Sequence, residues 1–271
     1  PVRELPEYGR RMTRVSLPTG LRRPRVTFMD CDGVIFDANA VKVSAFEAAL
    51  ADAPAGPRGA LIAHHKQTGG ISRYEKLRRF YTEMVPVDDP EAVIAEALRR
   101  FSEASVAGYR ALQPRPEALQ FAEALGGAAS VYVVSGSDGE ELRRICGEHG
   151  MLGHFAEVLG SPTKKVPHMR RVLEDRGVAP REALMIGDGR GDLEACRALG
   201  VPFIFLREMS EWTGADAHLG HVESLAADWP AVQQTLEQLQ ASVAAGGGSR
   251  VTRVFRLNSA DAGQTARTLR D

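Results

Sequence analysis

The sequence predicts an α/β protein built on a doubly wound parallel sheet, with an α-helical domain inserted after the first strand. Two observations lead to this fold class. Over the second half of the chain, short apolar runs alternate with stretches of helical periodicity, as parallel strands and their connecting helices do. Between the first and second apolar runs, in contrast, the pattern is helical and shows no convincing strand.

Four apolar runs have the length and composition of buried parallel strands. They are residues 26–29, 131–134, 183–186 and 203–206. Helical patterns lie between and around the later runs, at residues 116–125, 140–149, 166–176 and 192–199. Gly126 and Gly127 follow the first of these helices and Gly200 follows the last, so glycine marks both helix ends.

The inserted segment, residues 38–112, is expected to form a separate helical cap domain. Within it, Asp89 and Pro90 form a favourable N-cap and first-turn pair for a long helix. The proline-containing segment 113–116 then serves as the expected hinge back to the core.

Both ends of the chain differ from the rest in composition. The N-terminus is rich in arginine and lacks the apolar core of a signal peptide. Near the C-terminus, residues 244–249 have the composition of a flexible linker, and residues 251–257 could form a strand of unknown pairing. We therefore expect an N-terminal extension (1–24), a core domain (25–37 and 113–240), a cap domain (38–112) and a C-terminal tail (241–271).

The composition argues against several classes of partner. With a net charge of −1, the chain has no global basic field that would favour nucleic acid or an anionic membrane. No apolar run approaches the ~20 residues that span a bilayer. The three cysteines, Cys31, Cys146 and Cys196, lack metal-ligand spacing, and their odd number favours a reduced, cytoplasmic protein. The oligomeric state is not readable from the sequence.

Acidic residues gather where two of the predicted strands end, and ligands bind at that edge of open α/β sheets. Asp30 and Asp32 follow the first strand, and Gly33 permits a turn that lets both face one pocket. Asp188 and Asp192 follow the third strand. Because unshielded carboxylates repel phosphate, this cluster makes sense with a divalent cation in between. The simpler interpretations are a turn at Asp32 and a helix N-cap at Asp192.

Two further clusters could bind a phosphate. Ser135 and the backbone N–H of Gly136 follow the second strand and precede a helix, as in many anion sites. Lys164 and Lys165 precede the next helix, where one lysine could neutralise the acids and contact phosphate. The simpler interpretations are an ordinary strand-to-helix loop and a solvated pair of lysines.

Taken together, these segments resemble the four motifs of the haloacid dehalogenase superfamily, in the family's order. The matching residues are Asp30-x-Asp32-Gly33-Val34, Ser135, Lys165 and Gly187-Asp188-x-x-x-Asp192. Lys165 is preferred to Lys164 because Lys165-Val166-Pro167 is similar to the start of that helix in relatives. The resemblance covers roughly residues 25–225 and is specific only in combination.

The inserted segment resembles the helical cap of the phosphoglycolate phosphatase and β-phosphoglucomutase branch. Residues 70–77 are similar to the cap segment that carries a substrate-binding arginine there, which implies a specificity role for Arg73. Lys76 and His65 are the next candidates for substrate specificity. The simpler interpretation of Arg73 and Lys76 is an exposed helix face.

The resemblance implies a Mg²⁺-dependent phosphatase that hydrolyses a small phosphomonoester, such as a sugar phosphate, through an aspartyl-phosphate. Asp30 would be the nucleophile, and Asp32 the general acid and base. Asp30, Asp188 and the backbone carbonyl of Asp32 would bind Mg²⁺, with Asp192 orienting its water shell. Phosphoryl oxygens would contact a set of three residues: Ser135, Gly136 and Lys165.

Three alternatives remain at this stage. A phosphomutase of the β-phosphoglucomutase type would use the same residues. A catalytically silent binding module is disfavoured because Asp30, Asp32 and Asp188 are all present. A dinucleotide-binding enzyme is disfavoured because Asp192 occupies the position where the loop needs its third glycine.

Overall fold

Six parallel strands form the main sheet of the computed structural model, in the order β4-β3-β2-β5-β6-β7. The structure describes residues 12–16, 24–219, 223–226, 228–232 and 252–256. The strands are β2 (Val26–Met29), β3 (Val131–Asp138), β4 (Glu157–Ser161), β5 (Ala183–Gly187), β6 (Phe203–Leu206) and β7 (Glu223–Ala226). Chain order reverses on either side of β2, so β2 lies at the topological switch point where such sheets bind ligands.

The predicted fold class and all four predicted strands are confirmed. Two strands of this sheet, β4 and β7, were not predicted. In β4 the reason is visible in the sequence, because the strand begins with the exposed Glu157 and ends in Gly160-Ser161, which interrupts the apolar run. β3 also continues four residues past the predicted Val134, to Asp138. Its register against β4 shifts between Val134 and Asp138, so the second polar cluster lies on an extended, irregular strand end rather than in a loop.

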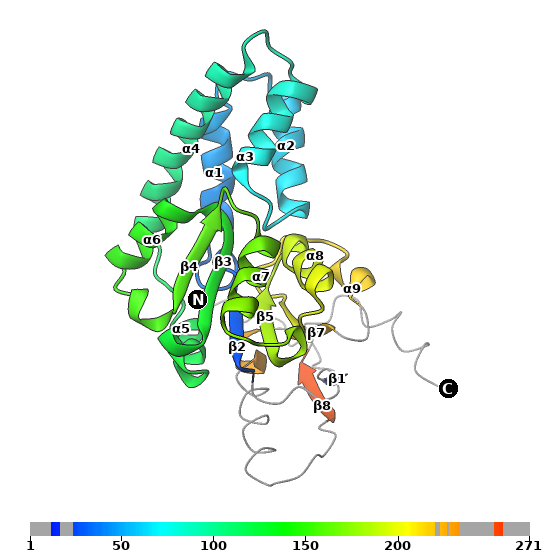
Figure 1. Cartoon of the computed structure of the whole chain (residues 1–271). Helices are drawn as coiled ribbons and strands as arrows, with labels where there is room; N and C mark the ends of the chain where they lie inside the picture. The colour runs from blue at the N-terminus through cyan, green and yellow to red at the C-terminus, as the bar shows by residue number, and fades with distance from the viewer. Residues whose placement is uncertain (1–11, 17–23, 220–222, 227, 233–251, 257–271) are drawn as a thin grey trace, which may run out of the picture.

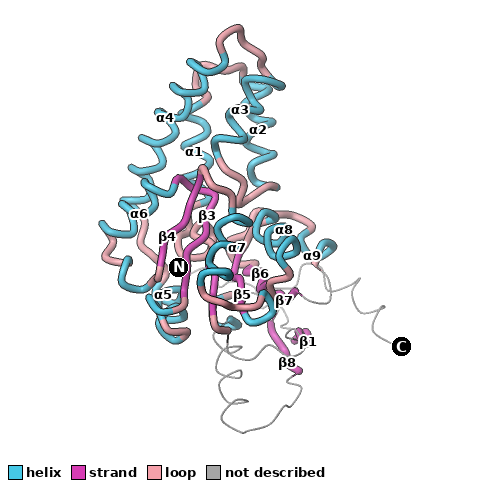
Figure 2. The backbone as a smooth tube through the Cα atoms, viewed as in Figure 1, coloured by secondary structure: helices cyan, strands magenta, loops and turns pink. Residues whose placement is uncertain are grey.

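Helices cover both faces of this sheet (Figure 2). They are α5 (Pro116–Ala124), α6 (Gly139–Glu148), α7 (Lys165–Asp175), α8 (Arg190–Leu199) and α9 (Ala215–His218), with short 3₁₀ turns at Gly127–Ala129, Leu152–His154 and Pro180–Glu182. Met29 packs in one apolar cluster with α5 and α6. Phe28 packs in a second with α7 and α8. Because successive side chains of β2 point to opposite faces of the sheet, the core consists of two apolar layers, one on each face.

The insertion between β2 and β3 is helical, and it forms the cap domain that the fold class includes. Its elements are α1 (Asn39–Ala49), α2 (Ala55–Gln67), α3 (Arg73–Arg79), a π-helical turn (Phe80–Met84) and α4 (Pro90–Ala111). Asp89 caps α4 by accepting from the Ala92 N–H at 3.3 Å, as predicted. Phe46, Leu77 and Phe101 belong to an apolar cluster separate from those of the sheet. Figure 1 shows these helices beyond the upper ends of β3 and β4.

The strand expected near the C-terminus is present and has a partner. β8 (Thr252–Arg256) pairs antiparallel with β1 (Met12–Ser16), which lies in the N-terminal extension. The expected linker at 244–249 falls outside the described residues. No helix among the described residues combines the length and the apolar character needed to cross a bilayer.

Candidate active site

Asp30 and Asp32 lie in the turn that follows β2, as the sequence predicts. The Asp30 N–H donates to the carbonyl of Ile186 on β5 at 2.9 Å, which ties the start of this turn to the neighbouring strand. Gly33 has a φ of +73°, and a Cβ there would collide with the carboxylate of Asp188. Glycine is therefore required for both the left-handed backbone and the close approach of Asp188.

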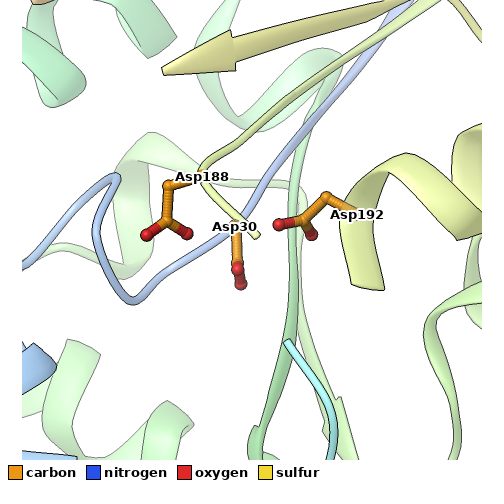
Figure 3. A group of neighbouring side chains, drawn as sticks. All are labelled: Asp30, Asp188 and Asp192. Carbon is orange, nitrogen blue, oxygen red and sulfur yellow. The ribbon is translucent and has the colours of Figure 1, made fainter. Parts of the chain in front are cut away.

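The tertiary structure brings three carboxylates together from two strand ends. Asp30, Asp188 and Asp192 are all buried, and each offers an oxygen within 4.8 Å of the others. Figure 3 shows these side chains converging from the ends of β2 and β5 and from the start of α8. This convergence is what the strand order predicts for polar clusters that are distant in sequence.

One lysine lies among these carboxylates. Lys165 Nζ is 2.9 Å from Asp30 Oδ1 and also pairs with Asp192, whereas Lys164 is 74% exposed and pairs with Glu75 of the cap. Burial lowers the pKa of Lys165, but the charges of Asp192 and Asp30 outweigh burial and hold this pKa above its usual value. Of the two candidate lysines, the structure therefore brings Lys165 to the site.

The carboxylate cluster carries more negative charge than Lys165 balances. Burial and the charge of Asp192 raise the pKa of Asp30 to about 8. Burial and the charge of Asp30 likewise raise the pKa of Asp188 well above its usual range. Three buried carboxylates, all oxygen donors, fit a hard divalent cation such as Mg²⁺, which would relieve this repulsion.

Asp192 differs from its two neighbours because both of its oxygens already have donors. Oδ2 accepts from the Gly189 N–H at 3.0 Å, and Oδ1 accepts from Lys165. These contacts fix the carboxylate at the N-terminal turn of α8. The N-cap of α8 is Gly189, so the simpler interpretation of Asp192 as the N-cap is wrong. Asp192 is the third residue of the helix, accepts from the N-cap N–H, and also belongs to the group of carboxylates that could hold a metal.

The expected phosphate contacts, Ser135 and Gly136, lie on the end of β3, beneath a loop of the cap. Ser135 is buried, and its Oγ accepts from the Ser137 N–H at 3.1 Å. A Cβ on Gly136 would come within 2.5 Å of the carbonyl oxygen of Gly70. The Gly191 N–H also donates to the carbonyl of Gly69 at 3.1 Å. Cap and core therefore meet through backbone contacts directly above these residues.

Asp32 lies outside the cluster of Asp30, Asp188 and Asp192 and has cap partners that sequence reasoning missed. Lys42 of α1 lies 3.4 Å from Asp32 Oδ2 and donates to Ser137 Oγ at 2.7 Å. Ser137 donates to Asp32 Oδ2 at 2.8 Å, and the Tyr109 hydroxyl of α4 donates to Oδ1. A lysine on the otherwise apolar face of α1, beside Ala45 and Phe46, was the available signal.

Arg73 is buried and not exposed, so the simpler interpretation of this residue is wrong. Its two Nη atoms each donate to Glu141 of α6 at 2.7 Å, and one also donates to Ser102 at 3.1 Å. Its Nε has no hydrogen-bond partner among the described residues. Next to it, the Tyr74 hydroxyl donates to Asp138 at 2.6 Å. Arg73 therefore joins the cap to the core while bordering the enclosed cavity above Asp30.

Lys76 and His65 form a buried pair inside the cap. Lys76 is 3% exposed, and its Nζ lies 2.8 Å from His65 Nδ1 and 2.9 Å from the Thr68 carbonyl. Burial, followed by the charge of Lys42, lowers the pKa of Lys76 to about 7. His65 borders the cavity above Asp30, while Lys76 lies behind it. An exposed helix face is thus wrong for Lys76 as well.

Comparisons with known proteins agree with this arrangement. A family model described as haloacid dehalogenase-like hydrolase matches residues 24–200. A hydrolase from Pseudomonas syringae has a similar fold (16% identity, TM-score 0.64, covering 79% of this chain and 98% of that one). A predicted phosphoglycolate phosphatase from Haemophilus somnus is also similar in fold (16% identity, TM-score 0.62, covering 80% of this chain and 99% of that one). So is CbbY from Rhodobacter sphaeroides in complex with phosphate (22% identity, TM-score 0.54, covering 76% of this chain and 95% of that one). No curated protein matches the sequence.

Proposed function

The chain belongs to the haloacid dehalogenase-like hydrolases, and from this membership we propose that it is a Mg²⁺-dependent phosphatase acting on a small phosphomonoester. The observation that carries the proposal is the pairing of two carboxylates with different surroundings. Asp30 lies with Asp188, Asp192 and Lys165, while Asp32, two residues on, faces the cap. These different surroundings support phosphoryl transfer by Asp30 and proton transfer by Asp32.

In the first step, Asp30 attacks phosphorus in line, forming an aspartyl-phosphate as the ester P–O bond breaks. Asp30, Asp188 and the backbone carbonyl of Asp32 would hold Mg²⁺, which would supply positive charge that offsets repulsion between carboxylates and phosphate. Asp192, whose carboxylate is fixed by the Gly189 N–H, would orient the water shell of the ion. The raised pKa of Asp30 supports a need for such charge, because only the ionised carboxylate is a nucleophile.

Three groups of the core would hold the phosphoryl oxygens during transfer: the Ser135 hydroxyl, the Gly136 N–H and the Lys165 ammonium. Ser135 and Lys165 are both buried, so their dipole and charge act in a medium with little competing water. Lys165 Nζ also lies 2.9 Å from Asp30 Oδ1, so its positive charge is next to the attacking carboxylate. These contacts support transition-state stabilisation by preorganised donors.

Asp32 would protonate the leaving alkoxide in the first step. In the second, it accepts a proton from water as the water oxygen attacks phosphorus and the bond to Asp30 breaks. Its contacts with Tyr109 and Ser137 hold the carboxylate outside the cluster of Asp30, Asp188 and Asp192. That position supports a proton-transfer role separate from the nucleophile.

The cap would close over the substrate and exclude bulk water. The cavity bordered by Asp30, Asp32 and Arg73 has a volume of about 50 Å³, which supports a small substrate. We retain the division into a core (25–37 and 113–240) and a cap (38–112), which the separate apolar cluster of the cap supports. A reducing, cytoplasmic location fits Cys31 and Cys146, which are buried free thiols.

A substrate screen tests this function. Purified protein with Mg²⁺ is assayed for phosphate release from phosphorylated sugars, nucleotides, phosphoglycolate and an aryl phosphate, with Asp30→Asn as the matched inactive control. We expect release by the wild type and none by the variant. Isomerised sugar phosphate without released phosphate would indicate a mutase instead, and no turnover of any compound would contradict both.

A further inference from the structure

Two cavities meet at the candidate active site, one on each side of the contact between Gly70 and Gly136. The first, of about 50 Å³, is bordered by Asp30, Asp32 and Arg73. The second, of about 230 Å³, is bordered by Ser135 and Lys165. The two cavities share Gly70, Ile71 and Gly136. Ser135 and Lys165 border only the second cavity, while Asp30 and Asp32 border only the first.

The two cavities differ in their access to solvent. No residue that borders the first cavity is exposed. The second runs from the buried Ser135 and Lys165 to Thr163, Lys164 and Glu194, which are exposed. The second cavity therefore extends from the buried Ser135 and Lys165 toward residues at the surface.

We propose that this second cavity is a passage through which inorganic phosphate leaves the closed enzyme, separate from the opening of the cap that admits the phosphomonoester. The inference rests on the proposed phosphatase function. It assigns the leaving alcohol to the first cavity and phosphate to the passage. This route requires no chemical step beyond hydrolysis. Phosphate only has to move from Ser135 and Lys165 into the second cavity.

The walls of the passage suit a small oxyanion. Hydroxyls of Ser135, Ser161 and Thr163 border it, together with the N-terminal turn of α7 at Lys164 and Lys165. Hydroxyl groups and helix N-termini stabilise anions. Its acidic residues are already paired, Glu75 with Lys164 at 2.9 Å and Glu194 with Arg190 at 2.7 Å. Neither acid therefore presents an uncompensated charge that would repel phosphate.

An ion pair between cap and core crosses the outer part of the passage. Glu75 lies on α3 of the cap, and Lys164 precedes α7 of the core; their side chains are 52% and 74% exposed. Exposed pairs are screened by water and contribute little, so this contact opens readily without the cap leaving the core. Lys164, which does not contact the carboxylates, thus lies at the outer end of the passage.

Oxygen exchange between ¹⁸O-labelled phosphate and water tests the passage. In the reverse of hydrolysis, Asp30 attacks bound phosphate, one oxygen leaves as water after protonation by Asp32, and unlabelled water then regenerates phosphate. The number of oxygens exchanged per binding event measures how long phosphate stays. A Thr163→Trp substitution fills the exposed end, and Glu194→Trp fills the opposite wall as a second, independent plug. Glu174→Trp, exposed on α7 and away from the passage, is the control.

We expect each plug to raise the exchanges per binding event by about fivefold or more and to slow phosphate association by the same factor, with phosphate affinity unchanged. The control should match the wild type, and circular dichroism should show that all variants are folded. Wild-type exchange with plugs equal to the control would overturn the passage and leave the phosphatase intact. Absence of both exchange and substrate hydrolysis in the wild type would overturn the phosphatase function itself.

Discussion

Lys42, on the cap helix α1, lies 3.4 Å from the Oδ2 atom of Asp32, in the turn after β2. Its ammonium donates to Ser137, which in turn donates to the same carboxylate oxygen, and it lies 4.8 Å from the centre of the Tyr109 ring. Lys42 and Tyr109 both come from the cap. The cap therefore supplies two of the groups beside Asp32, and the core supplies the third, Ser137.

Lys42→Met should lower the turnover of an alkyl phosphate by about tenfold, because Asp32 loses a group that orients it. An aryl phosphate should lose less, since its leaving group needs less protonation. The measurement is the ratio of kcat/KM values for the two substrates in the wild type and the variant. Lys66→Met, a cap lysine with a 42% exposed side chain, is the control. An equal loss on both substrates would show that Lys42 does not act through proton transfer to the leaving group.

Asp30→Asn should fold normally and lose turnover by several orders of magnitude, because the amide cannot attack phosphorus. Intact-mass measurement after mixing with substrate should show added phosphate on an Asp32→Asn variant, in which hydrolysis of the intermediate is slowed. The same mass shift should be absent from Asp30→Asn. Substantial phosphatase activity in folded Asp30→Asn would exclude Asp30 as the nucleophile.

Chelation with EDTA should abolish activity, and Mg²⁺ should restore it. Ca²⁺ should restore it poorly, because its larger and looser coordination misplaces the nucleophile. Mg²⁺ should also raise the thermal unfolding temperature of the wild type but not that of Asp188→Asn, which lacks one of the buried carboxylates. Full activity in excess EDTA would contradict the metal requirement.

Arg73→Ala should lower kcat/KM by about tenfold for the best substrate of the screen. Glu141→Gln should cause most of the same loss, because the bidentate pair holds the cap on the core. Arg73→Lys should restore little, since an ammonium cannot make both contacts. The double variant should lose no more than Arg73→Ala. Wild-type activity in Glu141→Gln would instead favour direct substrate binding through the unpartnered Nε.

The stability of the protein should depend on pH through Lys76. Its pKa falls from 10.5 to about 7 in the folded state, so between these values only the unfolded state keeps the proton. The free energy of unfolding therefore rises with pH across this window. Lys76→Met removes the titration, so its stability relative to the wild type should be greatest below pH 7 and should shrink toward pH 10. Urea unfolding across this range tests the slope, and a difference independent of pH would refute it.

Local sequence patterns determined the architecture and the grouping of three carboxylates. Apolar runs followed by aspartates located β2 and β5, and strands joined by helices implied a parallel sheet whose carboxyl ends converge. Asp30, Asp188 and Asp192 could therefore be grouped from the sequence. The choice of Lys165 over Lys164 came from the family resemblance, and the structure agrees with it. The apolar pattern of a strand or helix spans only a few consecutive residues, and the order of these elements follows the chain. Both can therefore be read from the sequence.

Only the tertiary structure decided how the cap meets the core. Lys42 and Ser137 are 95 residues apart, and Arg73 and Glu141 are 68 apart. A lysine or arginine on a helix gives no local sign of the carboxylate that it will contact, so the sequence left an exposed helix face and a specificity role both open for Arg73. β8 likewise revealed its partner β1 only in three dimensions. Such contacts depend on how separately folded elements pack against each other, and the spacing of residues along the chain does not encode that packing.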